Sequence, residues 1–334
     1  MGKKSERVRD FFRCRRNSKA PPKEEEDTAD KKDEAKGDQD DTNKKDMEIM
    51  PPPLGEGQIS TYFHVGACAK ECLLRGFKLG SWQLSCTSMT NKGIQLSTFG
   101  EAYPKINDVF GGVEVFKEIG NFHFSHSWFT THEFLSELGL RFASAYGIFN
   151  TTIGTKDEVT LKSKLKCGFE LNPIKVDLVV PIYKEPLVMG YVVAAPVDSC
   201  LFGYRTVYNL EEKGFDMHAF CLGYYNGQSE VGLKLENFKN LRGSIFQRIG
   251  ENWAVALKAN LYSAENVKQL SVGAQYNFQN GTLLKVRLRD DSRIGFVFQK
   301  NVNNHVEVMY HFGFDLADPK GGAHRFGASL DFQC

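Results

Sequence analysis

The sequence has 334 residues, a formal net charge of +1, and 41% hydrophobic and 12% aromatic residues. This length is sufficient for one large domain or two ordinary ones. No run approaches the roughly 18 consecutive apolar residues of a membrane-spanning helix, so we exclude a helix that crosses a membrane. The balanced charge leads us to expect no nucleic-acid partner.

Residues 1–53 are predicted to be a disordered, charged extension. Residues 1–19 contain eight Lys or Arg against two acidic residues, whereas residues 20–50 contain six basic against twelve acidic residues. So few apolar residues cannot bury enough surface to offset the entropy of the chain, and the first part lacks the apolar core of a secretory signal. The segment is either a solvated tail or an arm that binds anionic partners, and we place the folded part at residues 54–334.

The segment "STYFHVGACAKECLLRGF" (60–77) is predicted to form an amphipathic helix. Its apolar residues recur at three- and four-residue steps, and charged residues occupy the remaining positions. Gly76 provides the stop signal. The apolar positions are Tyr62, Val65, Ala69, Cys72 and Leu73.

From Leu79 onward the sequence predicts strands only. Segments of roughly nine to eleven residues alternate apolar and polar positions, and turn sequences such as "NFQNG", "RDDSR", "YNGQS" and "DPKGG" separate them. In "WAVALKANLY" (253–262), for example, Trp253, Val255 and Leu257 share one face. The number of such segments is about nineteen.

The alternation is compatible with a soluble β-sandwich or with a membrane barrel, and three features favour the barrel. The segments have the roughly 9–11 residues that a tilted strand needs to cross a bilayer. This many antiparallel strands would leave exposed edges unless the sheet closed on itself. Aromatic residues cluster at segment ends, as an interfacial girdle requires. We therefore predict an all-β transmembrane barrel; the girdle candidates are Trp128, Phe142, Tyr262, Phe278 and Phe314.

In such a barrel the polar face lines a pore. Basic residues outnumber acidic residues on this face, and a basic surplus in the lumen raises the local concentration of anions and repels cations. The sequence therefore predicts an anion preference; the alternative is that these side chains are solvated and confer no selectivity. The predicted pore-lining residues are Lys162, Lys164, Lys166, Lys234, Arg248, Lys258, Lys285, Arg287 and Arg289.

The eight cysteines are scattered and form no C-x-x-C or zinc-ligand pattern. We therefore expect free thiols in a reducing compartment, with no metal and no cofactor. The sequence contains no G-x-S-x-G, H-E-x-x-H or P-loop motif. The chain is predicted not to be an enzyme.

Taken together, these residues resemble the mitochondrial voltage-dependent anion channels, or eukaryotic porins. The resemblance extends from Pro51 to Cys334 and is most specific in "TYFHVGACAKECLLRGFKLG", "RGSIFQRI" and "GGAHRFGASLDFQ". It implies a barrel of about nineteen strands, the number characteristic of that family, with the first and last strands paired in parallel. It also implies that the amphipathic helix lies inside the lumen.

The resemblance implies a voltage-gated, anion-preferring diffusion pore of the mitochondrial outer membrane. Such a pore passes small ions and metabolites such as ATP and ADP, contacts membrane lipids and associates into homo-oligomers. Three alternatives stay open. They are a non-conducting or cation-shifted barrel that serves as an outer-membrane scaffold, a protein-import channel, and a soluble lipid-binding β protein.

The resemblance also implies roles for particular residues. Arg75 matches a basic residue associated with ATP contact, and Gly76 and Gly80 bracket a hinge at which glycine permits the backbone turn of a gating helix. The segment "RFGASLDF" (325–332) matches the last-strand insertion signal of mitochondrial outer-membrane barrels. The positions that match an NADH-binding region are Arg293, Ile294, Gly295, His311 and Asp315.

The sequence departs from the family in three places. His126 stands at a lipid-facing position where the family usually carries an acid, and a neutral imidazole costs less in lipid than a carboxylate. Arg287 and Arg289 add positive charge late in the wall, and the extension 1–53 is absent from ordinary members. These departures predict a divergent paralogue with altered selectivity, gating and partner binding.

Overall fold

The computed structural model describes residues 50–51, 58–155, 159–264, 269–320 and 324–334. The chain divides into two units, Met1–Gln58 and Ile59–Cys334, and the described helices and strands all belong to the second. The predicted disordered extension and its boundary at residue 54 lie outside the described residues, except for Met50 and Pro51.

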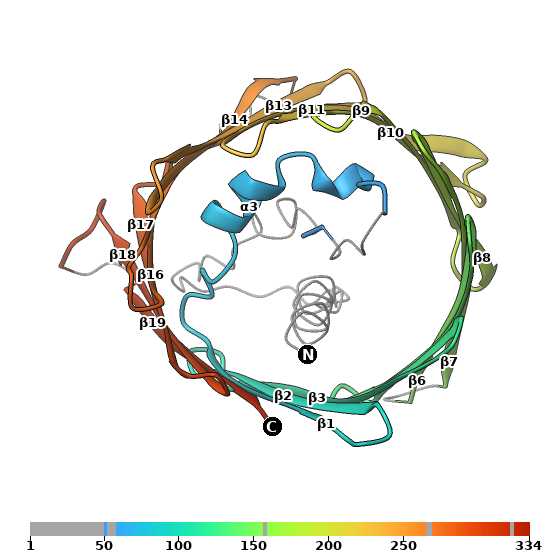
Figure 1. Ribbon diagram of the computed structural model, residues 1–334, viewed down its shortest axis with the longest axis horizontal. Helices are drawn as coiled ribbons and strands as arrows, with labels where there is room; N and C mark the ends of the chain where they lie inside the picture. Colours follow the sequence, from blue (N-terminus) through green and yellow to red (C-terminus); the bar gives the residue numbers. More distant parts are fainter. Residues whose placement is uncertain (1–49, 52–57, 156–158, 265–268, 321–323) are drawn as a thin grey trace, which may run out of the picture. The chain divides into compact units, whose positions relative to one another are not determined.

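One closed sheet of nineteen strands makes up the second unit (Figure 1). The first ten are β1 (Trp82–Met89), β2 (Ile94–Tyr103), β3 (Asp108–Ile119), β4 (Phe122–Phe129), β5 (Glu133–Phe142), β6 (Ala145–Gly154), β7 (Thr160–Leu171), β8 (Ile174–Tyr183), β9 (Leu187–Val197) and β10 (Cys200–Asn209). The others are β11 (Gly214–Tyr225), β12 (Ser229–Glu236), β13 (Asn240–Ile249), β14 (Trp253–Ser263), β15 (Leu270–Asn277), β16 (Thr282–Arg289), β17 (Arg293–Asn303), β18 (Val306–Asp315) and β19 (Arg325–Gln333).

Each strand pairs antiparallel with its neighbours in sequence, and the barrel closes where β1 pairs in parallel with β19. The register at this seam runs from Trp82 opposite Ala328 to Thr87 opposite Gln333. Closure leaves no strand edge without a partner, which is the physical requirement for β-structure in lipid. The predicted nineteen-strand closed barrel, with its parallel seam, is therefore confirmed.

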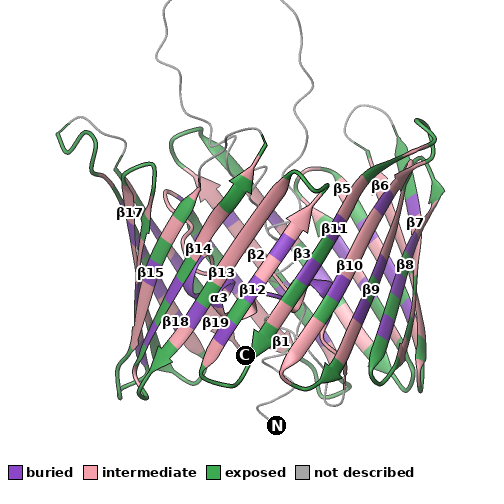
Figure 2. Cartoon of the chain, turned by 90° about the horizontal axis from the view of Figure 1, so that it is seen from above, coloured by how far each residue is buried: buried purple, intermediate pink, exposed green. Residues whose placement is uncertain are grey.

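The two faces of the barrel have the polarity of a membrane protein. In β1, Trp82 and Leu84 are about half exposed, whereas the alternating Gln83 and Ser85 are buried. Figure 2 shows buried and exposed residues alternating along the strands in this way. Because the large apolar side chains point outward and polar ones inward, the transmembrane interpretation holds and the soluble sandwich is excluded. Among the described residues no helix has the length and hydropathy to cross a bilayer.

The helical segment lies inside the barrel (Figure 1) and is shorter than predicted. It consists of a 3-10 turn, η1 (Tyr62–His64), and a helix, α3 (Ala67–Leu73). The two are separate because Gly66 adopts a left-handed conformation with φ of 74°, which a continuous helix cannot contain. The turn η1 contacts β9 and β10, and α3 contacts β13, β14 and β15.

Candidate functional site

The segment from Ile59 to Ser81 is attached to the inner wall from its first residue. The backbone N–H of Ile59 donates to Glu170 of β7. Arg141 Nη2 and Lys175 Nζ donate to the same carboxylate at 3.0 and 3.3 Å. The two cations therefore bind one oxygen of Glu170 and offset its charge, and the other oxygen accepts the hydrogen bond from the start of the segment.

The turn η1 is held by an aromatic contact. Tyr62 is buried, and its ring lies 6.2 Å from the ring of Tyr191 on β9. Nζ of Lys234 lies 5.3 Å from the Tyr62 ring centroid, which is a cation–π distance. Val65 is buried in the same cluster, which also contains Ala219. These contacts position the residues that lead into α3.

A carboxylate from the wall caps the N-terminus of α3. Glu230 of β12 accepts hydrogen bonds from the backbone N–H groups of Ala67 at 2.9 Å, Cys68 at 2.7 Å and Ala69 at 3.3 Å. The first N–H groups of a helix have no partner within it and carry partial positive charge, so an anion stabilises them. Burial, followed by the nearby charge of Glu230, raises the pKa of the Cys68 thiol to about 12.

Two cations from β16 hold the other end of α3. Lys285 Nζ donates to the carbonyl oxygen of Glu71 at 2.7 Å. Arg287 Nη1 donates to that of Leu73 at 2.9 Å, and the guanidinium lies 4.4 Å from the ring centroid of Phe77. The last carbonyls of a helix carry partial negative charge. The helix is thus bound at both ends by wall charges of the appropriate sign.

The apolar face of α3 packs on a small cluster of the inner wall. Ala69, Cys72 and Leu73 are buried against Phe246 of β13 and two alanines of β14. Burial in this cluster raises the pKa of the Cys72 thiol to about 11. This contact adds hydrophobic burial to the charged contacts at the two ends.

Seven glycines of the inner wall, which we call the glycine lane, lie under successive residues of the segment. A Cβ on Gly273 would lie 2.6 Å from Leu73 Cδ2, and one on Gly295 would lie 3.0 Å from the ring of Phe77. Because these positions have no side chain, the segment approaches the backbone of the wall directly. The lane comprises Gly203, Gly223, Gly232, Gly273, Gly295, Gly313 and Gly327, next to Tyr62, Val65, Gly66, Leu73, Phe77, Leu79 and Ser81 in that order.

The two predicted hinge residues have backbone conformations that favour glycine. Gly76 has φ of 91° and Gly80 has φ of 82°, both in the left-handed region. A Cβ on Gly76 would also lie 3.2 Å from Val297 Cγ1. The conformation explains why glycine occupies both positions; movement about them remains a prediction.

The predicted pore-lining cations fall into two groups. Lys234, Lys285 and Arg287 contact the helical segment. The others lie elsewhere on the barrel wall. Of these, Lys162 and Arg248 are exposed, and Lys164, Lys166, Lys258 and Arg289 are partly exposed. Two of them have an acidic neighbour: Lys164 lies 3.9 Å from Glu185, and Arg289 lies 3.6 Å from Asp291.

The residues proposed for nucleotide contact are only partly brought together. Arg293 and Asp315 are register partners across β17 and β18. Gly295 lies under Phe77, and His311 is 1% exposed. Ile294 has the opposite parity to Arg293 and Gly295, and Arg75 pairs with Glu71 at 2.8 Å.

His126 lies on the same face of β4 as Phe124 and Trp128, both of which are exposed. Its ring centroid is 4.1 Å from that of Phe124 and 5.2 Å from that of Phe134. The ring therefore packs among aromatic side chains, and its contact with lipid remains a prediction.

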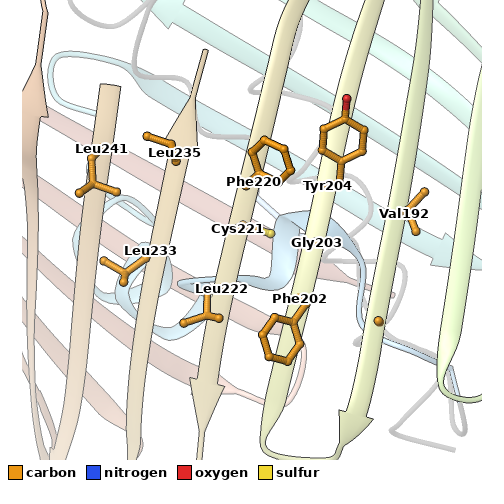
Figure 3. Close-up of a pocket in the computed structure, with 11 residues that line it drawn as sticks. Val192, Phe202, Gly203, Tyr204, Phe220, Cys221, Leu222, Leu233, Leu235 and Leu241 are labelled. Atoms are coloured by element: carbon orange, nitrogen blue, oxygen red, sulfur yellow. The ribbon is translucent and has the colours of Figure 1, made fainter. Parts of the chain in front are cut away.

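An apolar groove of about 440 Å³ lies over β9 to β13 (Figure 3). Phe202, Phe220 and Leu222 line it and are among the exposed apolar residues of the outer face. The groove therefore belongs to the outer surface and is separate from the site around α3.

Sequence reasoning did not single out Glu230, Glu170 or the glycine lane. The alternation in "SEVGLKLE" (229–236) places Glu230 on the polar face, which is the available signal. Its hydrogen-bond partner Cys68 is 162 residues earlier, so no local pattern connects them.

The chain matches the family model for eukaryotic porin over residues 58–327. A voltage-dependent anion-selective channel from Drosophila melanogaster is 22% identical over 298 residues, which is 85% of this chain and 100% of that protein. The non-selective voltage-gated ion channel VDAC3 from Oryctolagus cuniculus and from Homo sapiens is 22% identical over 278 residues in each case, covering 82% of this chain and 98% of each relative.

Proposed function

This chain belongs to the eukaryotic porin family, whose members are non-enzymatic pores, and from that premise we propose an anion-preferring diffusion pore of the mitochondrial outer membrane. Membership of the family and the closed barrel support a voltage-dependent transmembrane channel in general terms. The preference for anions, the passage of metabolites such as ATP and ADP, and the outer-membrane location are the proposed refinements.

The accessibility of the inner-face charges supports the anion preference. Three inward-facing acids, Glu114, Glu137 and Asp177, are each at most 6% exposed. Their partners are Ser125 for Glu114 at 2.7 Å, His123 for Glu137 at 3.5 Å, and Tyr146 for Asp177. Lys162 and Arg248, by contrast, are exposed. Lys162 and Arg248 therefore present accessible positive charge to ions in the lumen, which favours anions.

Reversal potentials in a salt gradient test this preference, with purified protein in planar bilayers. We expect the wild-type potential to lie on the chloride side of zero and the double variant Lys164→Glu/Lys166→Glu to move it toward the potassium side. Lys92→Glu, in the exposed turn between β1 and β2, is the matched control and should change little. A wild-type value on the potassium side, or absence of conductance, would favour the cation-shifted or non-conducting scaffold.

We also propose that the segment 59–81 is the gating element. Movement about Gly76 and Gly80 has to break the contacts of α3 with Glu230 and Lys285, so those contacts set the energy of the docked state. Labelling of Cys68, which is partly buried in the docked state, follows this movement directly. If the labelling rate is the same at holding voltages that open and close the channel, the helix is not the gate.

Contact with a nucleotide is proposed at Arg293 and Asp315, which are register partners on the inner face. We expect ATP or NADH to reduce the wild-type conductance and to have a weaker effect on Arg293→Gln. An equal effect on both proteins would exclude this location.

Homo-oligomers, proposed from the family resemblance, should be trapped by lysine cross-linking in liposomes, and recovery of monomer alone would contradict them.

A further inference from the structure

The inner face of β4 carries an imidazole close to one mouth of the barrel. His123 is the second residue of this strand and directly follows the turn of residues 120–121. Its neighbours Phe122 and Phe124 are exposed on the outer face, so His123 points into the lumen. The His123 side chain is 24% exposed. Water in the lumen therefore reaches the ring and can exchange a proton with it.

The neighbouring strand β5 provides a seat for this ring. Gly139 is the register partner of His123, and a Cβ on Gly139 would collide with the imidazole. The ring thus lies over bare backbone, where a larger residue would displace it. Its Nε2 lies 3.5 Å from Oε1 of Glu137. An ordinary N–H···O hydrogen bond measures about 2.7–3.2 Å, so a neutral ring gains little from this carboxylate, whereas a charged ring forms an ion pair with it.

The other charged groups on the strands beside His123 add to this negative environment. On β3, Glu118 is the register partner of His123 and is exposed, and Glu114 is the next acid on the same inner face. On β5, the next inward residue beyond the glycine is Arg141, which is already paired with Glu170 at 3.0 Å. A positive charge on the imidazole would therefore enter surroundings in which carboxylates predominate.

We propose that His123 is a selectivity-determining residue whose protonation strengthens the anion preference of the channel, an inference that rests on the diffusion pore proposed above. Imidazole is the side chain whose charge ordinarily changes between about pH 5 and pH 8, whereas carboxylates titrate near about pH 4. With a neutral ring, the mouth presents the negative charges of Glu137 and Glu118. Protonation pairs the imidazolium with Glu137 and lowers the negative charge that attracts cations and repels anions there.

The test measures the reversal potential of the purified full chain in planar bilayers under a salt gradient, at about pH 8 and at about pH 6. Acidification should move the wild-type potential further toward the chloride side, and His123→Gln should lose most of this shift. His123→Lys carries a permanent charge, so its potential at the higher pH should already lie toward the chloride side of the wild-type value and should change little with pH. His132→Asn removes a histidine from the exposed turn between β4 and β5 and is the matched control, which should shift as the wild type does.

Titration of the imidazole itself is the second measurement, and it needs no current. In micelles of the isotopically labelled full chain, the ring Cε1 resonance that is missing from His123→Gln should move between about pH 8 and about pH 6. A resonance that stays constant over this range, or a shift in reversal potential that persists in His123→Gln, would overturn the proposal.

The two measurements separate this inference from the pore on which it rests. A wild-type potential on the potassium side that still moves with pH through His123 would contradict the anion-preferring pore and confirm the role of this residue. Absence of conductance would contradict the pore and, with it, any effect of His123 on selectivity, even if the ring titrates.

Discussion

Replacing Glu230 by glutamine should release α3 from the wall. The carboxylate receives three backbone N–H groups, one on Oε1 and two on Oε2. Glutamine keeps one acceptor oxygen and turns an NH₂ group toward the other donors, so at least one N–H loses its partner. The change also removes the negative charge next to the positive end of the helix.

The expected magnitude follows from these contacts. A hydrogen bond to a charged group contributes about 1.5–3 kcal/mol, and a charge at a helix terminus contributes about 0.3–1 kcal/mol. Because Glu230 is only 6% exposed, salt screens these interactions little. The docked state of Glu230→Gln should therefore lose about 2–4 kcal/mol relative to the undocked state, which is roughly a 30- to 1000-fold change in the docking equilibrium.

The assay is the rate at which a maleimide labels Cys68, measured peptide by peptide with mass spectrometry. Maleimides react with the thiolate, and a pKa of about 12 leaves few Cys68 thiolates at pH 8. In Glu230→Gln the substitution itself removes the neighbouring carboxylate, and undocking removes the burial, which is the larger cause of the raised pKa, so the rate should rise. The exposed turn variant Glu251→Gln should behave as wild type. An unchanged Cys68 rate in Glu230→Gln would refute the capping role.

Three further results are expected. Gly295→Ala should weaken docking by about 1–3 kcal/mol, because its Cβ would lie too close to the ring of Phe77. This variant should label faster at Cys68, whereas Gly147→Ala, with open space around it, should label at the wild-type rate. Lys285→Met should weaken docking by about 1.5–3 kcal/mol because carbonyls of α3 lose a charged donor, and the exposed Lys300→Met should leave the labelling rate unchanged. Phe332→Ser should leave the protein extractable by alkali after import into isolated mitochondria, and normal insertion would contradict the last-strand signal.

The insertion experiment uses Phe332 alone for a structural reason. Gly327 belongs to the same sequence pattern, and it is also the last glycine of the lane, where a Cβ would collide with the backbone of Ser81 and Lys78. A substitution at Gly327 therefore disturbs docking as well as any insertion signal. Phe332 lies on the opposite, outward parity and tests the signal by itself.

The barrel was predictable because its rule is local. Alternation in "WAVALKANLY" has a period of two, and β14 occupies Trp253–Ser263 as that period requires. Closure followed from the cost of exposed edges in lipid rather than from any single residue. The length of the helix was overestimated, since periodicity over residues 60–77 does not show that Gly66 adopts a left-handed conformation and interrupts it.

The docking site was less predictable because its contacts are not local. The charge of Lys285 and its place on the polar face are evident in the sequence. Its role at the end of α3 depends on a partner, Glu71, 214 residues earlier. Gly295 similarly shows only that a strand lacks a side chain, and its role depends on which part of the wall lies under Phe77. Local patterns carry no information about such pairings.

Recording of single channels from the purified full chain in planar bilayers tests the central claim most directly. The account predicts discrete conductance steps at low voltage, closure as the voltage increases in either direction, and a reversal potential on the chloride side of zero in a salt gradient. Absence of steps, or steps that reverse on the potassium side, would contradict it.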